Sequence, residues 1–251
     1  AGPSLREMHM KKLFLATTAL LLVTACNEKT ADKSGSAGDG AAVSAPAGAK
    51  WTETTAVTPD GGMLMGNLNA PVKLIEYGAL TCSHCAEFSE QSSVELKAMI
   101  DKGSVSYEFR TFLLNGLDIP AALLARCSGA GPFFPLAEQL FAAQRDWLGK
   151  AQALTAEDQK ALQAMTPAQL PSALADKLGL VEFVRQRGIP EEKAKACLAD
   201  AKAIDALVAM TDKGVREFKV QGTPTFVING VTQENTSNWE LLKPKLIDAG
   251  A

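Results

Sequence analysis

A long helical segment divides this chain and limits the folds open to it. From Ile119 to about Lys219, alanine and leucine recur at helical spacing, and no strand pattern appears. Strand patterns lie on both sides of this segment. With 251 residues, 47% of them hydrophobic, the chain is long enough to bury a sizeable core. The pattern predicts an α/β fold with an inserted all-helical domain.

The segment before the insertion predicts a strand, a helix and a second strand. Val72–Tyr77 is short and rich in β-formers, and its apolar residues on both faces are typical of a central strand. A helix is expected from Ser83 to about Lys102, where Gly103 ends it. Val105–Phe112 alternates between apolar and polar residues, which predicts the second strand.

The segment after the insertion predicts a hairpin and a helix. Thr225–Ile228 has strand character, and Asn229-Gly230 is a strong signal for a tight turn into a return strand at Val231. Ser237–Glu240 has the form of a capping box that opens a last helix.

The beginning of the chain has the features of an export signal. Met10-Lys11-Lys12 is followed by an apolar run, Leu13–Val23, which is shorter than the about 20 residues that a membrane span requires. Val23-Thr24-Ala25-Cys26 is similar to the lipobox of bacterial lipoprotein precursors. We therefore expect a signal peptide with extra N-terminal residues over 1–25 and a lipid on Cys26. The alternative is an ordinary signal peptide cut after Ala25, which would leave Cys26 a free thiol.

The composition of the chain after the signal peptide excludes several classes of function. Residues 26–50 combine the lipidated Cys26 with a polar, aromatic-free stretch that predicts a flexible linker. Of the two histidines only His84 would remain, which excludes a histidine-rich metal site. A net charge of −3 without a basic stripe argues against nucleic-acid binding.

Cys82-Ser83-His84-Cys85 is the main chemical motif. It lies where the strand gives way to the helix, so Cys82 meets unpaired N–H groups and the positive end of the helix dipole. Both favour the thiolate, and His84 can add positive charge or a hydrogen bond. Cys85 is nearly one turn further on and can close a disulfide onto Cys82. The alternatives are a structural disulfide and half a zinc site. A four-cysteine zinc site needs a second close pair, and Cys127 and Cys197 lie too far apart in the sequence to supply it. We favour redox chemistry.

Two stretches resemble the signatures of the DsbA family. They are Glu76–Cys85, which ends in the CxxC motif, and Gly222–Gly230. The resemblance covers roughly residues 57–250 and implies a thioredoxin fold with an inserted all-helical domain. The thioredoxin domain would comprise residues 51–118, with the CxxC, and 218–251, with a cis-proline loop; the insertion would be 119–217.

The resemblance also implies roles for single residues. Cys82 would form the mixed disulfide with substrate, and Cys85 would resolve it. Pro224 would be the cis-proline facing the disulfide, and the Thr223 backbone would pair with the substrate strand. Glu76 shares a strand face with Val72 and Leu74, so a partly buried carboxylate there can handle protons for Cys85; the alternative is a strand-end acid in solvent.

Two positions depart from the best-known oxidases of the family. Ser83-His84 replaces Pro-His, and Thr223 replaces Val, which bears on redox strength and on oxidase identity. Cys127 and Cys197 both lie in the insertion, and we interpret them as a structural disulfide similar to the second bridge of some DsbA relatives. Two buried free cysteines are the alternative.

The resemblance implies a disulfide donor. Its substrates would be unfolded or partly folded exported proteins with free cysteines, and a DsbB-like membrane partner would reoxidise it. We expect no cofactor, no metal and no nucleic acid, a monomer, and a location in the periplasm or cell envelope with a lipid anchor in a membrane. Alternatives are a disulfide isomerase or reductase of the same fold, and a non-catalytic lipoprotein that binds clients through thiols.

Overall fold

The computed structural model describes residue 45 and residues 48–251. The predicted signal peptide over residues 1–25, the predicted lipidation site Cys26 and nearly all of the linker lie outside the described residues. None of the described helices is both long enough and apolar enough to cross a membrane.

Within residues 48–251, six strands form one sheet in the order β1-β2-β4-β3-β5-β6. β3 and β4 are parallel, and every other neighbouring pair is antiparallel. The strands are β1 (Thr55–Val57), β2 (Met63–Gly66), β3 (Val72–Gly78), β4 (Val105–Thr111), β5 (Thr225–Ile228) and β6 (Val231–Thr232). The predicted strands are β3 to β6, and the turn at Asn229-Gly230 joins the last two.

β1 and β2 were not expected from the sequence. β1 has only three residues, and β2 contains no β-branched residue and ends in glycine. They form because β2 pairs with the edge of β4, and β1 then pairs with β2.

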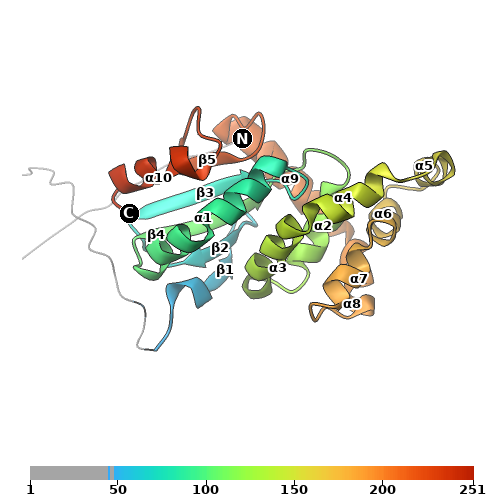
Figure 1. The fold of residues 1–251 in the computed structure, drawn as a ribbon, viewed down its shortest axis with the longest axis horizontal. Helices are drawn as coiled ribbons and strands as arrows, with labels where there is room; N and C mark the ends of the chain where they lie inside the picture. The colour runs from blue at the N-terminus through green and yellow to red at the C-terminus, as the bar shows by residue number, and fades with distance from the viewer. Residues whose placement is uncertain (1–44, 46–47) are drawn as a thin grey trace, which may run out of the picture. The chain divides into compact units, whose positions relative to one another are not determined.

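Helices cover both faces of the sheet and fill the insertion (Figure 1). They are α1 (Ser83–Asp101), α2 (Asp118–Arg126), α3 (Ala130–Ala142), α4 (Gln144–Gln152), α5 (Ala156–Gln163), α6 (Leu170–Leu178), α7 (Leu180–Arg185), α8 (Glu191–Leu198), α9 (Ala201–Phe218) and α10 (Trp239–Asp248), with a 3₁₀ turn at Trp51–Glu53. Within the described chain, the segment between β4 and β5 is helical and contains no strand.

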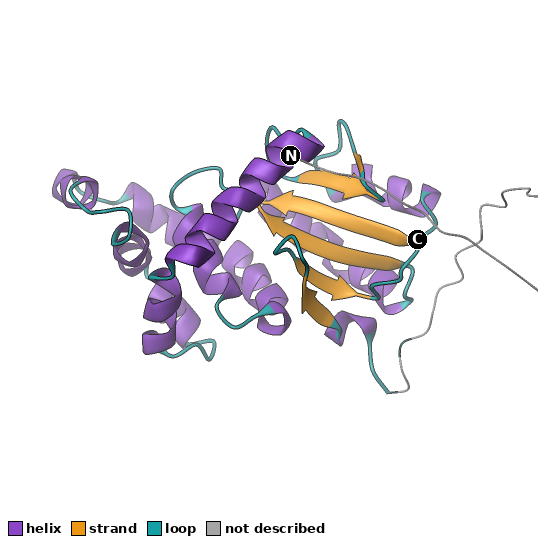
Figure 2. Cartoon of the chain, turned by 180° about the vertical axis from the view of Figure 1, so that it is seen from behind, coloured by secondary structure: helices purple, strands orange, loops and turns teal. Residues whose placement is uncertain are grey.

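α1 and α9 lie on opposite faces of the sheet (Figures 1 and 2). α1 packs on the face that holds Leu74 and Phe109, whereas Phe218 at the end of α9 packs with Tyr77 on the other. Figure 2 shows α9 running between the sheet and the other insertion helices, and it contacts both β4 and α2. α9 therefore forms a contact between the sheet and the other helices of the insertion.

α1 forms where its apolar spacing predicts. Its buried face consists of Cys85, Phe88, Ser92, Leu96 and Ile100, at intervals of three and four residues. Gly103, with a φ of 77°, follows its C-terminal end. The helix begins directly after Cys82, and this places the CxxC motif at its first turn.

The last helix begins one residue later than the capping box implied. Asn238, not Ser237, is the N-cap of α10, and its side chain accepts a hydrogen bond from the backbone N–H of Leu241. Asn and Ser are equally good N-caps, so composition alone does not choose between neighbouring candidates.

Candidate active site

Cys82 is the N-cap residue of α1, and its sulfur accepts a hydrogen bond from the backbone N–H of Cys85 at 3.4 Å. Both cysteines are free thiols in the structure. Cys82 is 8% exposed, whereas Cys85, one turn further into the helix, is fully buried. Only the first cysteine therefore offers its sulfur to the surface.

The surroundings of Cys82 lower its pKa to about 5. The largest cause is a hydrogen bond with the Cys85 thiol; Thr223 and the backbone N–H groups of Cys85 and His84 add to it and outweigh partial burial. Cys82 is therefore a thiolate at neutral pH. His84 is exposed, and its backbone N–H is one of the groups that lower the pKa of Cys82.

Cys85 has the opposite character. Burial, its hydrogen bond with Cys82 and the nearby Glu76 raise the pKa of Cys85 well above its ordinary value. One thiolate and one thiol at the start of a helix form an asymmetric pair: Cys82 is the better nucleophile and leaving group, and Cys85 requires a proton when the disulfide opens.

The loop before β5 faces the Cys82 sulfur. The Thr223–Pro224 peptide bond is cis, and the Cys82 thiol donates a hydrogen bond to the Thr223 carbonyl oxygen at 3.2 Å. The Thr223 hydroxyl is buried and has no hydrogen-bond partner within residues 48–251. Because Thr223 also lowers the pKa of Cys82, this hydroxyl is the group that can turn to the thiolate once the thiol proton is lost.

Glu76 lies inside the protein, on the strand beneath Cys85. It is 1% exposed, and burial raises its pKa to about 8, although the hydrogen bond from Tyr107 acts in the opposite direction. The carboxyl group and the Cys85 thiol each affect the pKa of the other. Glu76 can therefore hold a proton near neutral pH next to the thiol that needs one.

Gly78, the last residue of β3, lies close to the Glu76 carboxyl group and to the ring of Phe109. A Cβ at position 78 would lie 2.5 Å from the ring of Phe109 and 2.8 Å from an oxygen of Glu76. A larger residue here would force Glu76 or Phe109 to move, so the glycine maintains the packing of the site.

Tyr107 is a site residue that the sequence did not single out. Tyr107 lies on the neighbouring strand β4, and its hydroxyl donates a hydrogen bond to Glu76 Oε2 at 2.5 Å. Strand alternation predicted its face, shared with Phe109, but not its pairing opposite Leu74, which brings its hydroxyl to Glu76.

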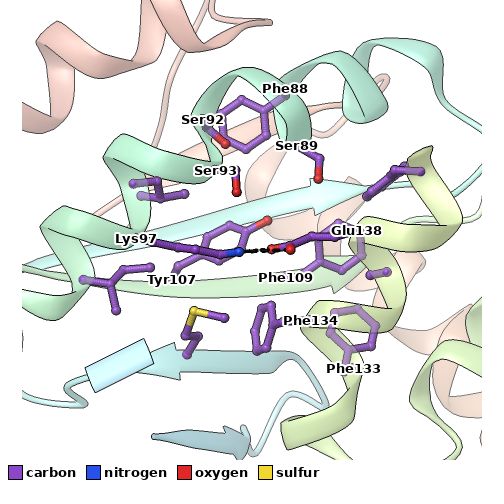
Figure 3. Close-up of a pocket in the computed structure, with 15 residues that line it drawn as sticks. Phe88, Ser89, Ser92, Ser93, Lys97, Tyr107, Phe109, Phe133, Phe134 and Glu138 are labelled. Carbon is purple, nitrogen blue, oxygen red and sulfur yellow. Dashed lines mark hydrogen bonds and ion pairs between the residues drawn. The ribbon is translucent and has the colours of Figure 1, made fainter. Parts of the chain in front are cut away.

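Tyr107 also lines a cavity of about 50 Å³ between α1, α3 and β4 (Figure 3). Ser89 and Ser93 of α1 supply polar atoms to its wall, and an ion pair of 2.7 Å between Lys97 and Glu138 lies across it. The volume is sufficient for water. Tyr107 thus lies between the buried carboxyl group and a cavity whose wall is largely apolar.

The other two cysteines of residues 48–251 are joined to each other. Cys127, which follows α2, and Cys197 in α8 form a disulfide with a Cα–Cα distance of 5.7 Å. It lies within the insertion and leaves Cys82 and Cys85 as the free pair. Within the part of the chain that the structure describes, no three His, Cys, Asp or Glu side chains are grouped to hold a metal ion.

Known proteins are similar to the part of the chain that carries this site. Residues 58–249 match the family described as thioredoxin. A relative from Rickettsia prowazekii, provisionally named a protein-disulfide oxidoreductase, is 32% identical over 188 residues, which cover 74% of this chain. A Rickettsia felis relative with the same provisional name is 31% identical over 190 residues. The chain spans about 60% of the length of these relatives.

Solved structures show the same architecture. A protein-disulfide isomerase from Novosphingobium aromaticivorans is 29% identical, with a TM-score of 0.70 over 74% of this chain and 95% of that one. Wolbachia pipientis α-DsbA1, at 21% identity, shares the fold with a TM-score of 0.61 over 78% of this chain and 93% of that one. This chain belongs to the thioredoxin family, and its fold is the DsbA-like form with an inserted helical domain.

Proposed function

We propose that this protein is a thiol–disulfide oxidoreductase that introduces disulfide bonds into exported proteins through a Cys82–Cys85 disulfide. The observation that carries the proposal is the asymmetry of the pair. Cys82 has a pKa of about 5, whereas Cys85 is buried with a raised pKa. A stabilised thiolate favours the reduced form and so makes the disulfide a strong oxidant.

The transfer begins when a client thiolate attacks the Cys82 sulfur. The Cys82–Cys85 bond breaks, and Cys85 leaves and takes a proton from Glu76. A second client thiolate attacks the client sulfur of the mixed disulfide, and Cys82 leaves as a thiolate that needs no proton. The client loses two electrons, and the cysteine pair gains them. Glu76 regains its proton from solvent.

Thr223 and Pro224 complete the site. Because the Thr223 carbonyl oxygen lies 3.2 Å from the Cys82 sulfur, its backbone is placed to pair with an extended client segment beside that cysteine. Clients would be unfolded or partly folded proteins with free cysteines. We propose a lipid on Cys26 that holds the protein at a membrane of the cell envelope, and a DsbB-like membrane protein that reoxidises it.

The main alternative is isomerase or reductase activity on the same fold. The relative that favours it is the Novosphingobium protein, which is named a protein-disulfide isomerase. An isomerase works with its cysteine pair reduced, so its disulfide must be kept open by a reductant instead of being given to clients.

The reduction potential of Cys82–Cys85 decides between them. Equilibration of the wild-type protein with glutathione at pH 7 should give a value of about −120 mV, that of DsbA, whereas a value of about −180 mV, that of protein disulfide isomerase, would favour the isomerase alternative. A value near −270 mV, like that of thioredoxin, would mean that the disulfide is too stable to donate and would contradict the oxidase proposal.

A further inference from the structure

Two buried side chains from the helical segment between β4 and β5 hold the loop that precedes the CxxC motif. The first is Gln144, the first residue of α4. Its side-chain amide donates hydrogen bonds to the carbonyl oxygens of Leu80 at 2.8 Å and Cys82 at 2.9 Å. Gln144 is 5% exposed, so its amide nitrogen has little access to solvent.

The second side chain is Asp118, the first residue of α2. It is fully buried, and its carboxylate accepts hydrogen bonds from the Thr81 backbone N–H at 2.9 Å and the Thr81 hydroxyl at 3.0 Å. The backbone N–H groups of Leu114 and Asn115 donate to the same carboxylate. Three consecutive residues, 80 to 82, are thus bonded to the helical segment between β4 and β5, although Gln144 follows Cys82 by 62 positions.

These contacts bear on the Cys82 sulfur through the orientation of its peptide group. The Cys82 carbonyl accepts from the backbone N–H of Ala86 as well as from Gln144, so it is fixed from two sides. Because a peptide unit is planar, fixing this carbonyl also fixes the N–H of Ser83 and the start of the first turn. That turn presents the N–H groups of His84 and Cys85 to the sulfur.

A role in packing alone does not account for the choice of these residues. Burying an amide or a carboxylate costs free energy that an apolar side chain of the same size does not cost. Here the Gln144 amide binds only the loop that carries the reactive cysteine, and the Asp118 carboxylate joins that loop to the turn before α2.

We propose that Gln144 and Asp118 are positioning residues that hold the loop so that the first N–H groups of α1 face the Cys82 sulfur, which makes the helical insertion part of the redox site. The proposal rests on the proposed redox role of Cys82. It predicts that loosening the loop destabilises the thiolate more than the disulfide, because only the thiolate depends on several N–H donors.

The test is Gln144→Met, since methionine has a similar length and cannot donate a hydrogen bond. In glutathione buffers at pH 7, the equilibrium should move about three- to tenfold toward the disulfide, which is roughly 14 to 30 mV more negative. The pKa of Cys82, followed by thiolate absorbance in the reduced protein, should rise by about half a unit to one unit.

Asp118→Asn tests the loop from its other side. Asparagine is the same size but has one acceptor oxygen, so the bonds from Thr81 and Leu114 cannot all persist. It should shift both measurements in the same direction, and it keeps the proposal testable if Gln144→Met does not fold.

Leu162→Ala is the matched control for general damage to the insertion. Leu162 is buried in α5, and none of the hydrogen bonds of the loop involves it. This variant should lower the melting temperature and leave the glutathione equilibrium unchanged. If the folded Gln144 and Asp118 variants also lose stability while staying within about twofold of the wild-type equilibrium, their role is structural and the proposal is wrong.

These outcomes separate the two proposals. A wild-type potential near that of thioredoxin would contradict the donor function, yet a shift between wild type and Gln144→Met would still support the positioning role. A strongly oxidising wild type with an unshifted Gln144→Met variant would support the donor function and contradict the positioning role.

Discussion

Glu76 shows how one buried residue connects stability to pH. Burial raises its pKa from 4.5 to about 8 in the folded protein. A group whose pKa is raised on folding contributes stability that is complete below the unfolded value and is lost as pH rises through the folded value. The wild-type protein should therefore lose stability between about pH 4.5 and 8 because of this carboxyl group.

Glu76→Gln should remove that loss. Urea unfolding of the reduced protein should show wild type and variant closest at pH 5, with the variant gaining a few kcal/mol relative to wild type by pH 9. Tyr107→Phe deletes the hydrogen bond that lowers the pKa of Glu76, so this pKa should rise and the loss of stability should extend to higher pH. Tyr77→Phe, on the other sheet face, is the control. A difference between wild type and Glu76→Gln that does not change with pH would contradict the burial.

Sequence reasoning finds the residues of the site that are local in the chain. The spacing of Cys82 and Cys85 and their place between strand and helix predict the thiolate end of the pair, and strand alternation predicts the face of Glu76. Tyr107, Asp118 and Gln144 were not found, because each contributes through a contact more than 30 positions away. Such contacts depend on strand register and on how the insertion folds back.

At the scale of elements, the disulfide in the insertion is expected to serve stability alone. It joins the end of α2 to α8 across a sequence separation of 70. On the chain-entropy model, closing such a loop stabilises the folded state by roughly 4 kcal/mol. A Cys127→Ala, Cys197→Ala double variant should lose about that much in urea unfolding.

The same variant should keep the wild-type glutathione equilibrium of Cys82–Cys85, because the hydrogen bonds from Gln144 and Asp118 do not involve the deleted sulfurs. Unchanged unfolding would show that the loop is already constrained without the bond. Non-reducing peptide mapping of the wild type provides the check that the bond is formed.

Elements with strong periodicity could be predicted from the sequence, and the weak ones could not. The central strands and α1 have clear apolar spacing and matched expectation within a residue or two. β1 and β2 were missed because short strands at a sheet edge take their stability from pairing, here with β4, rather than from their own residues.

The whole molecule brings three segments of the chain to one sulfur atom. The first part of the thioredoxin domain supplies Cys82, the second part supplies Thr223 at 3.2 Å, and the insertion supplies Gln144, bonded to the Cys82 carbonyl. The resemblance to the DsbA family anticipated the first two segments. The third depends on the packing of α4 against the loop, for which the sequence carries no motif.

A site of this kind should form a covalent intermediate with its client, and Cys85→Ala should trap it. Cys82 of this variant is first loaded with glutathione by reaction with glutathione disulfide. A reduced, unfolded protein with a single thiol should then displace glutathione and remain bound to Cys82, because neither a second client thiol nor a Cys85 thiol is present to release it. Non-reducing electrophoresis should show a client complex that dithiothreitol removes. Cys82→Ala should form none, since Cys85 is fully buried. Equal, reductant-resistant binding by both variants would instead identify a binding lipoprotein.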